Sequence, residues 1–174
     1  MSIKTLVTLV TYVTRAGSTA EVAHSIAEVL TSHGAAVDVL PLKEVASLQG
    51  YQAVVLGSAV RMGAWLPEAV KFVEQNREAL DRVHSAFFAV HLMNLGEDET
   101  SRQARLAYLD PVRKLMKPCK EAFFAGVGDW KKVTFLEKMM AKMVKAPEGD
   151  FRNWPVIRSW AEELCQDGFA GEPV

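Results

Sequence analysis

The stretch from Leu6 to Thr19, LVTLVTYVTRAGST, decides the fold of this 174-residue chain. Its first part, Leu6 to Val13, is apolar and rich in β-branched residues, which is typical of a buried strand, and an amphipathic helical pattern begins at Ser18. The turn between them leads into a helix N-terminus, whose free N–H groups and positive dipole end attract an anion. We therefore expect a phosphate-binding turn made of Thr14, Arg15, Ala16, Gly17, Ser18 and Thr19.

The residue types of this turn suit a phosphate monoester. The hydroxyls of Thr14, Ser18 and Thr19 are hydrogen-bond donors, and Gly17 lets the backbone come close to the phosphate oxygens. Arg15 is expected to be a solvated side chain near the phosphate, and direct contact with the phosphate is the alternative. A plainer interpretation stays open, in which Ser18 and Thr19 only cap the helix.

Length and composition predict one domain that spans residues 1–174, with 49% hydrophobic residues for its core. Threonines interrupt the N-terminal apolar stretch, which lacks a small-residue cleavage site, and no apolar run approaches the length of a membrane span. Cys119 and Cys165 form no C-x-x-C motif and are expected to be buried, reduced thiols. These features predict a cytoplasmic protein.

Strands and helices alternate along the chain. Strands are expected at Lys4–Val13, Ala36–Leu42, Tyr51–Ser58, Ser85–Leu92 and Glu121–Val127. Helices are expected at Ser18–Ser32, Leu66–Leu80, Asp98–Met116 with a break near Pro111, and Pro155–Gln166. The third and fourth strands are apolar on both faces, which favours a parallel sheet covered by helices on both sides. The prediction is an α/β fold with a doubly wound, five-stranded sheet.

The loops that follow the strands hold the candidate binding residues, because ligands of such sheets lie beyond the carboxyl ends of the strands. Ser58, Ala59, Val60, Arg61, Met62, Gly63 and Trp65 follow the third strand. His91, Leu92, Met93 and Asn94 follow the fourth strand, and Gly126, Val127 and Gly128 follow the fifth. Together with the first turn, these loops are suited to hold a planar heterocycle that carries a phosphate. Arg61 is expected either to contact the ring or a substrate carboxylate, or to brace its own loop.

At this point the sequence resembles the flavodoxin superfamily, whose first loop has the pattern Ser/Thr-x-Thr-Gly-x-Thr. The loop here reads Thr14-Arg15-Ala16-Gly17-Ser18-Thr19 and departs from the pattern at Ala16. More closely, the chain looks like the flavodoxin-type, quinone-dependent protoporphyrinogen IX dehydrogenases. The matching pieces are the first loop, Gly57–Gly63 with the helix that follows, Ser85–Val90, and the Lys/Met-rich helix before the last segment. It departs from that family at Met62 and at Gly128-Asp129-Trp130.

The resemblance implies a flavodoxin-like sheet with strand order 2-1-3-4-5, and FMN as the cofactor. It also implies an oxidoreductase of heme biosynthesis that takes electrons from a substrate such as protoporphyrinogen and passes them to a quinone. The flavin carries the chemistry, so no catalytic side chain is expected. The alternative is a soluble, flavodoxin-like electron carrier that docks on redox-partner proteins. A protein that keeps the fold without strong flavin binding is a third hypothesis.

Residues 131–150 form an insertion relative to a minimal flavodoxin, and a basic amphipathic helix is expected in Lys131–Lys145. Val133, Leu136, Met140, Met143 and Val144 recur at helical spacing, and five lysines occupy other positions. Four roles stay open for this helix: packing on the core, covering the flavin, contacting a second subunit in a homo-oligomer, or lying on an anionic membrane surface. The last role would make the protein peripheral on the inner membrane face.

Other chemistries lack their motifs. No His, Cys, Asp and Glu cluster has the sequence spacing of a metal site, so no metal is expected. Gly126-x-Gly128 is only half of a dinucleotide fingerprint, and the first turn lacks the lysine of an ATP-binding P-loop. The formal net charge is −1, with a local basic excess between Arg113 and Lys145, and no nucleic-acid partner is expected.

Overall fold

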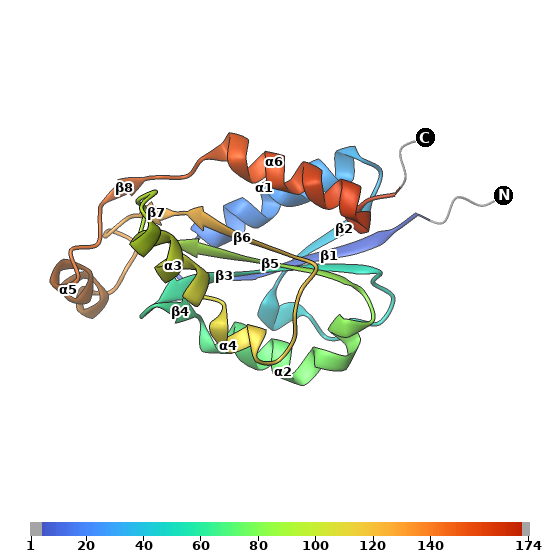
Figure 1. The fold of residues 1–174 in the computed structure, drawn as a ribbon, viewed down its shortest axis with the longest axis horizontal. Helices are drawn as coiled ribbons and strands as arrows, with labels where there is room; N and C mark the ends of the chain where they lie inside the picture. Colours follow the sequence, from blue (N-terminus) through green and yellow to red (C-terminus); the bar gives the residue numbers. More distant parts are fainter. Residues whose placement is uncertain (1–4, 172–174) are drawn as a thin grey trace.

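The computed structural model describes residues 5–171, and they build a sheet between two helical layers. The strands are β1 (Val7–Val13), β2 (Ala36–Pro41), β3 (Ala53–Arg61), β5 (His84–His91) and β6 (Lys120–Ala125). They run parallel in the order β2-β1-β3-β5-β6, which confirms the predicted doubly wound topology (Figure 1). The short β4 (Ala64–Trp65) turns back antiparallel onto β3.

Apolar residues on both faces explain why β3 and β5 lie inside the sheet. Val54, Val55 and Leu56 are fully buried, as are Phe87 and Phe88. The register pairs Leu56 with Phe87 and places Ser58 beside Ala89, so the carboxyl ends of β1, β3 and β5 meet at one edge. This edge carries the loops in which the sequence predicts a ligand.

Helices α1 (Ser18–Ser32) and α6 (Trp154–Leu164) cover one face of the sheet, and α2 (Pro67–Asp81) and α4 (Asp110–Arg113) cover the other (Figure 1). The core on the α1 side includes Val22, Ile26, Phe88, Trp160 and Leu164. The core on the α2 side includes Leu9, Leu56, Val73, Phe87 and Leu109. α3 (Glu99–Ala107) precedes α4, and the predicted break falls between them, just before Pro111.

Most predicted elements are confirmed within a few residues, and α1 has the predicted bounds. Lys4, the predicted start of the first strand, lies outside the described residues. The third strand continues beyond Ser58 to Arg61, because it pairs with β4. The second strand ends at Pro41 in a 3₁₀ turn (Leu42–Glu44), and α6 continues into a short π-helical turn (Cys165–Phe169).

The insertion after β6 folds into α5 (Phe135–Met143), flanked by β7 (Val127–Gly128) and β8 (Gly149–Asp150), which pair antiparallel. α5 lies at the carboxyl end of the sheet, at the left of Figure 1. No helix within residues 5–171 is long and apolar enough to cross a membrane.

The prediction of two buried thiols is wrong. Cys119 is exposed, because it lies in the connection from α4 into β6 and precedes the strand. Cys165 is half-buried at the end of α6, where burial raises the pKa of its thiol to about 11.

Candidate functional site

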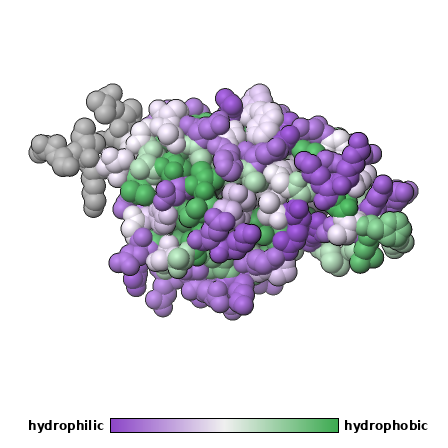
Figure 2. All heavy atoms as spheres, turned by 180° about the vertical axis from the view of Figure 1, so that it is seen from behind, coloured by the Kyte–Doolittle hydropathy of each residue, from purple (hydrophilic) through white to green (hydrophobic). Residues whose placement is uncertain are grey.

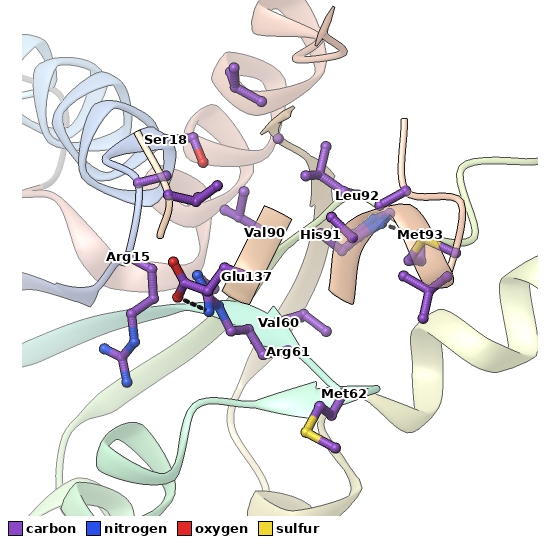
Figure 3. Close-up of a pocket in the computed structure, with 18 of the residues that line it drawn as sticks. Arg15, Ser18, Val60, Arg61, Met62, Val90, His91, Leu92, Met93 and Glu137 are labelled. Atoms are coloured by element: carbon purple, nitrogen blue, oxygen red, sulfur yellow. Dashed lines mark hydrogen bonds and ion pairs between the residues drawn. The ribbon is translucent and has the colours of Figure 1, made fainter. Parts of the chain in front are cut away.

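A cavity of about 470 Å³ opens at the carboxyl edge of the sheet, between the strand loops and α5. This volume is within the range of small-molecule sites. Most of the residues proposed from the sequence line it: Thr14, Arg15, Ala16, Ser18, Ala59, Val60, Arg61, Met62, Gly63, His91, Leu92, Met93, Asn94, Gly126 and Val127. Figure 3 shows side chains from the separate loops around this space.

Five of the proposed residues do not line the cavity: Gly17, Thr19, Ser58, Trp65 and Gly128. Two of them, Ser58 and Trp65, make contacts behind the second loop. Ser58 is buried, where its hydroxyl accepts from the Leu66 N–H at 3.1 Å and donates to the Ala59 carbonyl at 2.8 Å. The Trp65 ring packs on Phe87 at 5.2 Å between centroids. We infer that Ser58 and Trp65 support the second loop from beneath and do not contact a ligand.

The first loop is shaped by Gly17, which precedes α1 with φ of 97°. The Gly17 N–H donates to the Thr14 hydroxyl at 2.9 Å, which closes the turn. The first backbone N–H groups of a helix have no acceptor within the helix, and Gly17 has no side chain to cap those of α1. The Thr19 hydroxyl is buried and has no hydrogen-bond partner among the described residues. These donors fit a phosphate, and the interpretation of Ser18 and Thr19 as side-chain caps gains no support.

Arg15 points away from this donor set. Its guanidinium donates to the Glu68 carboxylate at 2.5 Å, and in Figure 3 it extends in the direction opposite to Ser18. The backbone N–H of Glu68, with Arg15 next, lowers the pKa of the Glu68 carboxyl. Arg15 thus lines the cavity, but its charge is paired with Glu68 on α2.

The second loop is a hairpin between β3 and β4. Val60 pairs with Trp65 and Arg61 with Ala64, which leaves Met62 and Gly63 as the two turn residues. Their φ angles are 52° and 75°, the left-handed values that a two-residue hairpin turn needs. A methionine at positive φ is uncommon, and the Met62 side chain is 92% exposed.

The third loop is held in place by Tyr108, which follows α3 and which sequence reasoning missed. The Asn94 side-chain amide donates to the Tyr108 hydroxyl at 2.7 Å, and that hydroxyl donates to the Met93 carbonyl at 3.2 Å. Arg105 donates to the carbonyls of Asn94 at 2.6 Å and Gly96 at 2.5 Å. This network fixes the backbone that lines one side of the cavity.

His91, at the end of β5, is a buried ring in the cavity wall. Its Nδ1 lies 2.8 Å from the Met93 carbonyl, so the proton is on Nδ1. Burial lowers the pKa of His91, and the hydrogen bond to Met93 only partly offsets this effect. The ring is therefore neutral near pH 7, and its Nε2 is an acceptor.

Gly126 and Gly128 allow close approaches at the end of β6. A Cβ on Gly126 would lie 2.7 Å from Val90 Cγ1 and 3.3 Å from the Ser18 hydroxyl. A Cβ on Gly128 would lie 2.2 Å from the Pro147 carbonyl oxygen, because β8 passes there. The absence of a side chain at Gly128 thus lets the end of the insertion pass close to β7.

Much of the remaining cavity wall comes from the insertion, for which covering the flavin was one of the four open roles. Val133, Glu137, Met140, Ala141, Val144 and Ala146 line the cavity. Asp129 and Trp130, which follow Gly128 in the loop after the fifth strand, line it as well. No residue of α5 is buried, so the hypothesis that this helix packs on the core is wrong. The helical pattern was visible in the sequence, but it does not say which surface the helix covers.

An ion pair joins this cover to the second loop. The Arg61 guanidinium donates to the Glu137 carboxylate, and Figure 3 shows the two side chains meeting across the cavity. The Thr134 N–H also donates to Glu137 at 2.9 Å, completing the capping box of α5. Thr134, with Arg61 next, lowers the pKa of the Glu137 carboxyl.

A cluster with metal-ligating atoms lies elsewhere. His33, Glu162 and Cys165 place one ligand atom each within 4.8 Å of one another, a grouping that the sequence spacing did not reveal. His33 Nε2 already lies 2.6 Å from the Glu162 carboxylate. These residues belong to the ends of α1 and α6 and do not line the cavity.

Comparisons with known proteins agree with this architecture. Protoporphyrinogen IX dehydrogenase (quinone) of Escherichia coli strain K12 is 24% identical to the chain over 170 residues, which cover 91% of the chain and 94% of the relative. Among solved structures, a flavodoxin from the domain Archaea superposes with a TM-score of 0.56 at 15% identity and covers 93% of this chain and 98% of its own.

Two further structures show the same fold. A flavodoxin of Streptococcus pneumoniae TIGR4 has a TM-score of 0.55 at 14% identity and covers 93% of this chain and 99% of its own. Rubredoxin oxygen:oxidoreductase of Desulfovibrio gigas has a TM-score of 0.54 at 13% identity and covers 94% of this chain but 35% of its own length. The model of the flavodoxin domain matches residues 9–153. The chain belongs to the flavodoxin domain family.

Proposed function

We propose that this protein is an FMN-dependent oxidoreductase that takes electrons from a reduced substrate of the protoporphyrinogen type and passes them to a quinone. The observation that carries the proposal is the mainly apolar cavity beside the phosphate-binding turn, which α5 covers, because a redox enzyme shields its reacting groups from water. The name of the E. coli relative, a protoporphyrinogen IX dehydrogenase, supports the substrate class.

FMN is the cofactor that the flavodoxin domain implies. The residues of the first loop fit its phosphate: the free amides of α1, the hydroxyls of Thr14 and Ser18, and the unpartnered hydroxyl of Thr19. We propose that the loops after β3, β5 and β6 hold its ring. When bound, FMN supplies the redox chemistry of this site.

The protein residues bind and orient the ligands, and they exclude water from the cavity. Met62, Met93, Met140 and Val144 give the cavity apolar walls, and α5 covers it from the solvent. Arg61 lines the cavity and is paired with Glu137, and a substrate carboxylate could take the place of Glu137 on its guanidinium. The neutral His91 offers an acceptor nitrogen within the wall. The substrate gives up hydrogen as electrons and protons, and the quinone takes them up as the quinol.

A second candidate is a soluble electron carrier, in line with the flavodoxins among the structural relatives. It is favoured by the exposed Met62 at the tip of the β3–β4 hairpin, which would contact a docked redox protein. In both cases the setting is the cytoplasm, and for the quinone-dependent enzyme it is the cytoplasmic face of the membrane.

A steady-state assay under anaerobic conditions separates these candidates. The protein, FMN and a soluble menaquinone analogue are mixed with protoporphyrinogen, and the fluorescence of the porphyrin product is followed. The enzyme is expected to form porphyrin only when both FMN and the quinone are present. Binding of FMN without porphyrin formation would reject the dehydrogenase and favour the carrier.

A further inference from the structure

α5 leaves a row of large apolar side chains without a partner in the described chain. Phe135 is 78% exposed, Leu136 67%, Met139 47% and Met143 81%. Figure 2 shows the apolar group as a green projection at the right-hand end of the molecule, which is the α5 end of Figure 1. We name Phe135, Leu136, Met139 and Met143 the outer face of α5.

The outer face is distinct from the side of α5 that covers the cavity. The cavity is lined by Glu137, Met140, Ala141 and Val144 and by none of the four outer residues. Helical periodicity explains this division, since residues three and four apart lie on one side of a helix. α5 therefore has two apolar sides, and only the inner one has a use in the cavity.

The charges around the outer face are mainly positive. Lys131, Lys132, Lys138, Lys142 and Lys145 are all exposed. Within residues 131–145 the only acid is Glu137, which pairs with Arg61. Outside this range, Asp129 lies 3.8 Å from Lys132, and Glu148 is exposed. Within residues 5–171, the ammonium groups of Lys138, Lys142 and Lys145 have no carboxylate within salt-bridge distance.

The exposed apolar side chains and the lysines together favour one of the two partners considered for the outer face, a second copy of the chain or a lipid surface. A second copy related by a two-fold axis would bring the lysines of one α5 toward those of the other, which is unfavourable. An anionic lipid surface takes both features, because the apolar side chains enter the headgroup boundary while the lysines contact the headgroups.

We propose that the outer face of α5 docks the protein on an anionic lipid surface, so that the cavity covered by the inner side of this helix lies close to the bilayer. The benefit of docking rests on the proposed function: a quinone dissolved in the membrane then reaches the cavity beside α5 without crossing water. The docking itself depends only on the outer face and its lysines.

Co-sedimentation with vesicles of phosphatidylglycerol and phosphatidylcholine tests the docking on the FMN-loaded protein. The wild type is expected to bind these vesicles and to bind pure phosphatidylcholine vesicles at least tenfold more weakly. Phe135→Ser with Met143→Ser, and separately Lys138→Glu with Lys142→Glu, are expected to lower binding to anionic vesicles at least tenfold. These residues do not line the cavity, so FMN affinity and turnover with a soluble quinone analogue stay unchanged.

Matched controls use exposed residues away from α5. Val156→Ser removes an apolar side chain of α6 that is 51% exposed, and Lys71→Glu with Lys114→Glu reverses two lysines on the α2 side. Both controls are expected to bind vesicles as the wild type does. Equal vesicle binding by the outer-face variants and the wild type would overturn the proposal.

A second outcome would also overturn the proposal: a dimer in light scattering that Phe135→Ser with Met143→Ser dissociates, together with no vesicle binding by the wild type. The proposed function is read out separately. If docking fails while turnover with the soluble quinone persists, only this inference is lost. If protoporphyrinogen is not oxidised but docking is observed, the proposed enzyme activity is rejected and the proposal of lipid docking is kept.

Discussion

Arg61 at the end of β3 and Glu137 on α5 form an ion pair although they are 76 positions apart in the chain. The pair links the hairpin of the second loop to the helix that covers the cavity. Both side chains are largely shielded from solvent, and the pair is the charged contact between α5 and the sheet loops in the described chain. It is a direct side-chain link between the cover of the cavity and the second loop.

Glu137→Gln is expected to loosen the cover and to speed FMN dissociation. A partly exposed ion pair is worth about 0.2–1 kcal/mol, so the dissociation rate should rise by about 1.5- to 5-fold. Stopped-flow fluorescence measures this rate when the FMN-loaded protein is mixed with an excess of an FMN analogue that occupies the vacated site. Glu99→Gln, which breaks the exposed pair with Arg102 on α3, serves as the control and should leave the rate unchanged. Equal rates for Glu137→Gln and the wild type would show that the pair does not hold the cover.

Gly17→Asp is expected to abolish FMN binding, because it places a carboxylate against the phosphate at the N-terminus of α1. Gly34→Asp is a close control, since Gly34 follows the other end of α1, also has a positive φ of 89°, and has open space for a Cβ. Both variants carry the same backbone strain and the same added charge. Fluorescence titration with FMN measures the affinity. Unchanged FMN affinity in Gly17→Asp would contradict the assignment of the phosphate-binding turn.

Gly57→Ala is expected to destabilise the fold by about 1–3 kcal/mol through overpacking. A Cβ at Gly57 would lie 2.0 Å from Phe88 Cζ, which is buried in the core against the sheet. Urea unfolding followed by circular dichroism measures the free energy of unfolding. Adding Phe88→Leu to Gly57→Ala should restore part of the loss, because the clash involves that ring. Strict additivity of the two substitutions would contradict the close approach.

The pKa of His91 predicts a pH dependence of stability. Burial keeps the ring neutral in the folded state, whereas the unfolded chain takes up a proton below its ordinary pKa of 6.5. The unfolded state therefore binds more protons in this range, and the free energy of unfolding should fall as the pH drops below about 6.5. His91→Gln should lack this part of the decrease. Parallel pH profiles for the wild type and His91→Gln would contradict the assignment.

The sequence predicted the sheet and the first loop well because these follow from local patterns. Apolar runs identify β3 and β5, and the strand, glycine turn and helix of the first 32 residues determine α1. The β3–β4 hairpin was not predicted, since Met62 stands at a turn position with φ of 52° where Gly or Asn is usual. Only the tertiary pairing with Trp65 reveals that β3 continues past Ser58.

The parts of the site that were missed depend on contacts between distant segments. Tyr108 reaches Met93 and Asn94 from the end of α3, and nothing in its own neighbourhood marks it as a loop support. Conversely, Ser58 and Trp65 were assigned to the cofactor site because they follow a strand, but their side chains face the core. The apolar pattern of α5 was clear, yet the same pattern fits the core, a membrane or a cavity cover.

The most direct test of the account is an anaerobic half-reaction experiment on the FMN-loaded protein. Protoporphyrinogen is added first and a soluble menaquinone analogue second, while the flavin absorbance is recorded. The account predicts bleaching of the flavin by the porphyrinogen and full recovery with the quinone. A flavin that stays oxidised after addition of protoporphyrinogen would contradict the account and leave the chain as an electron carrier or another kind of quinone reductase.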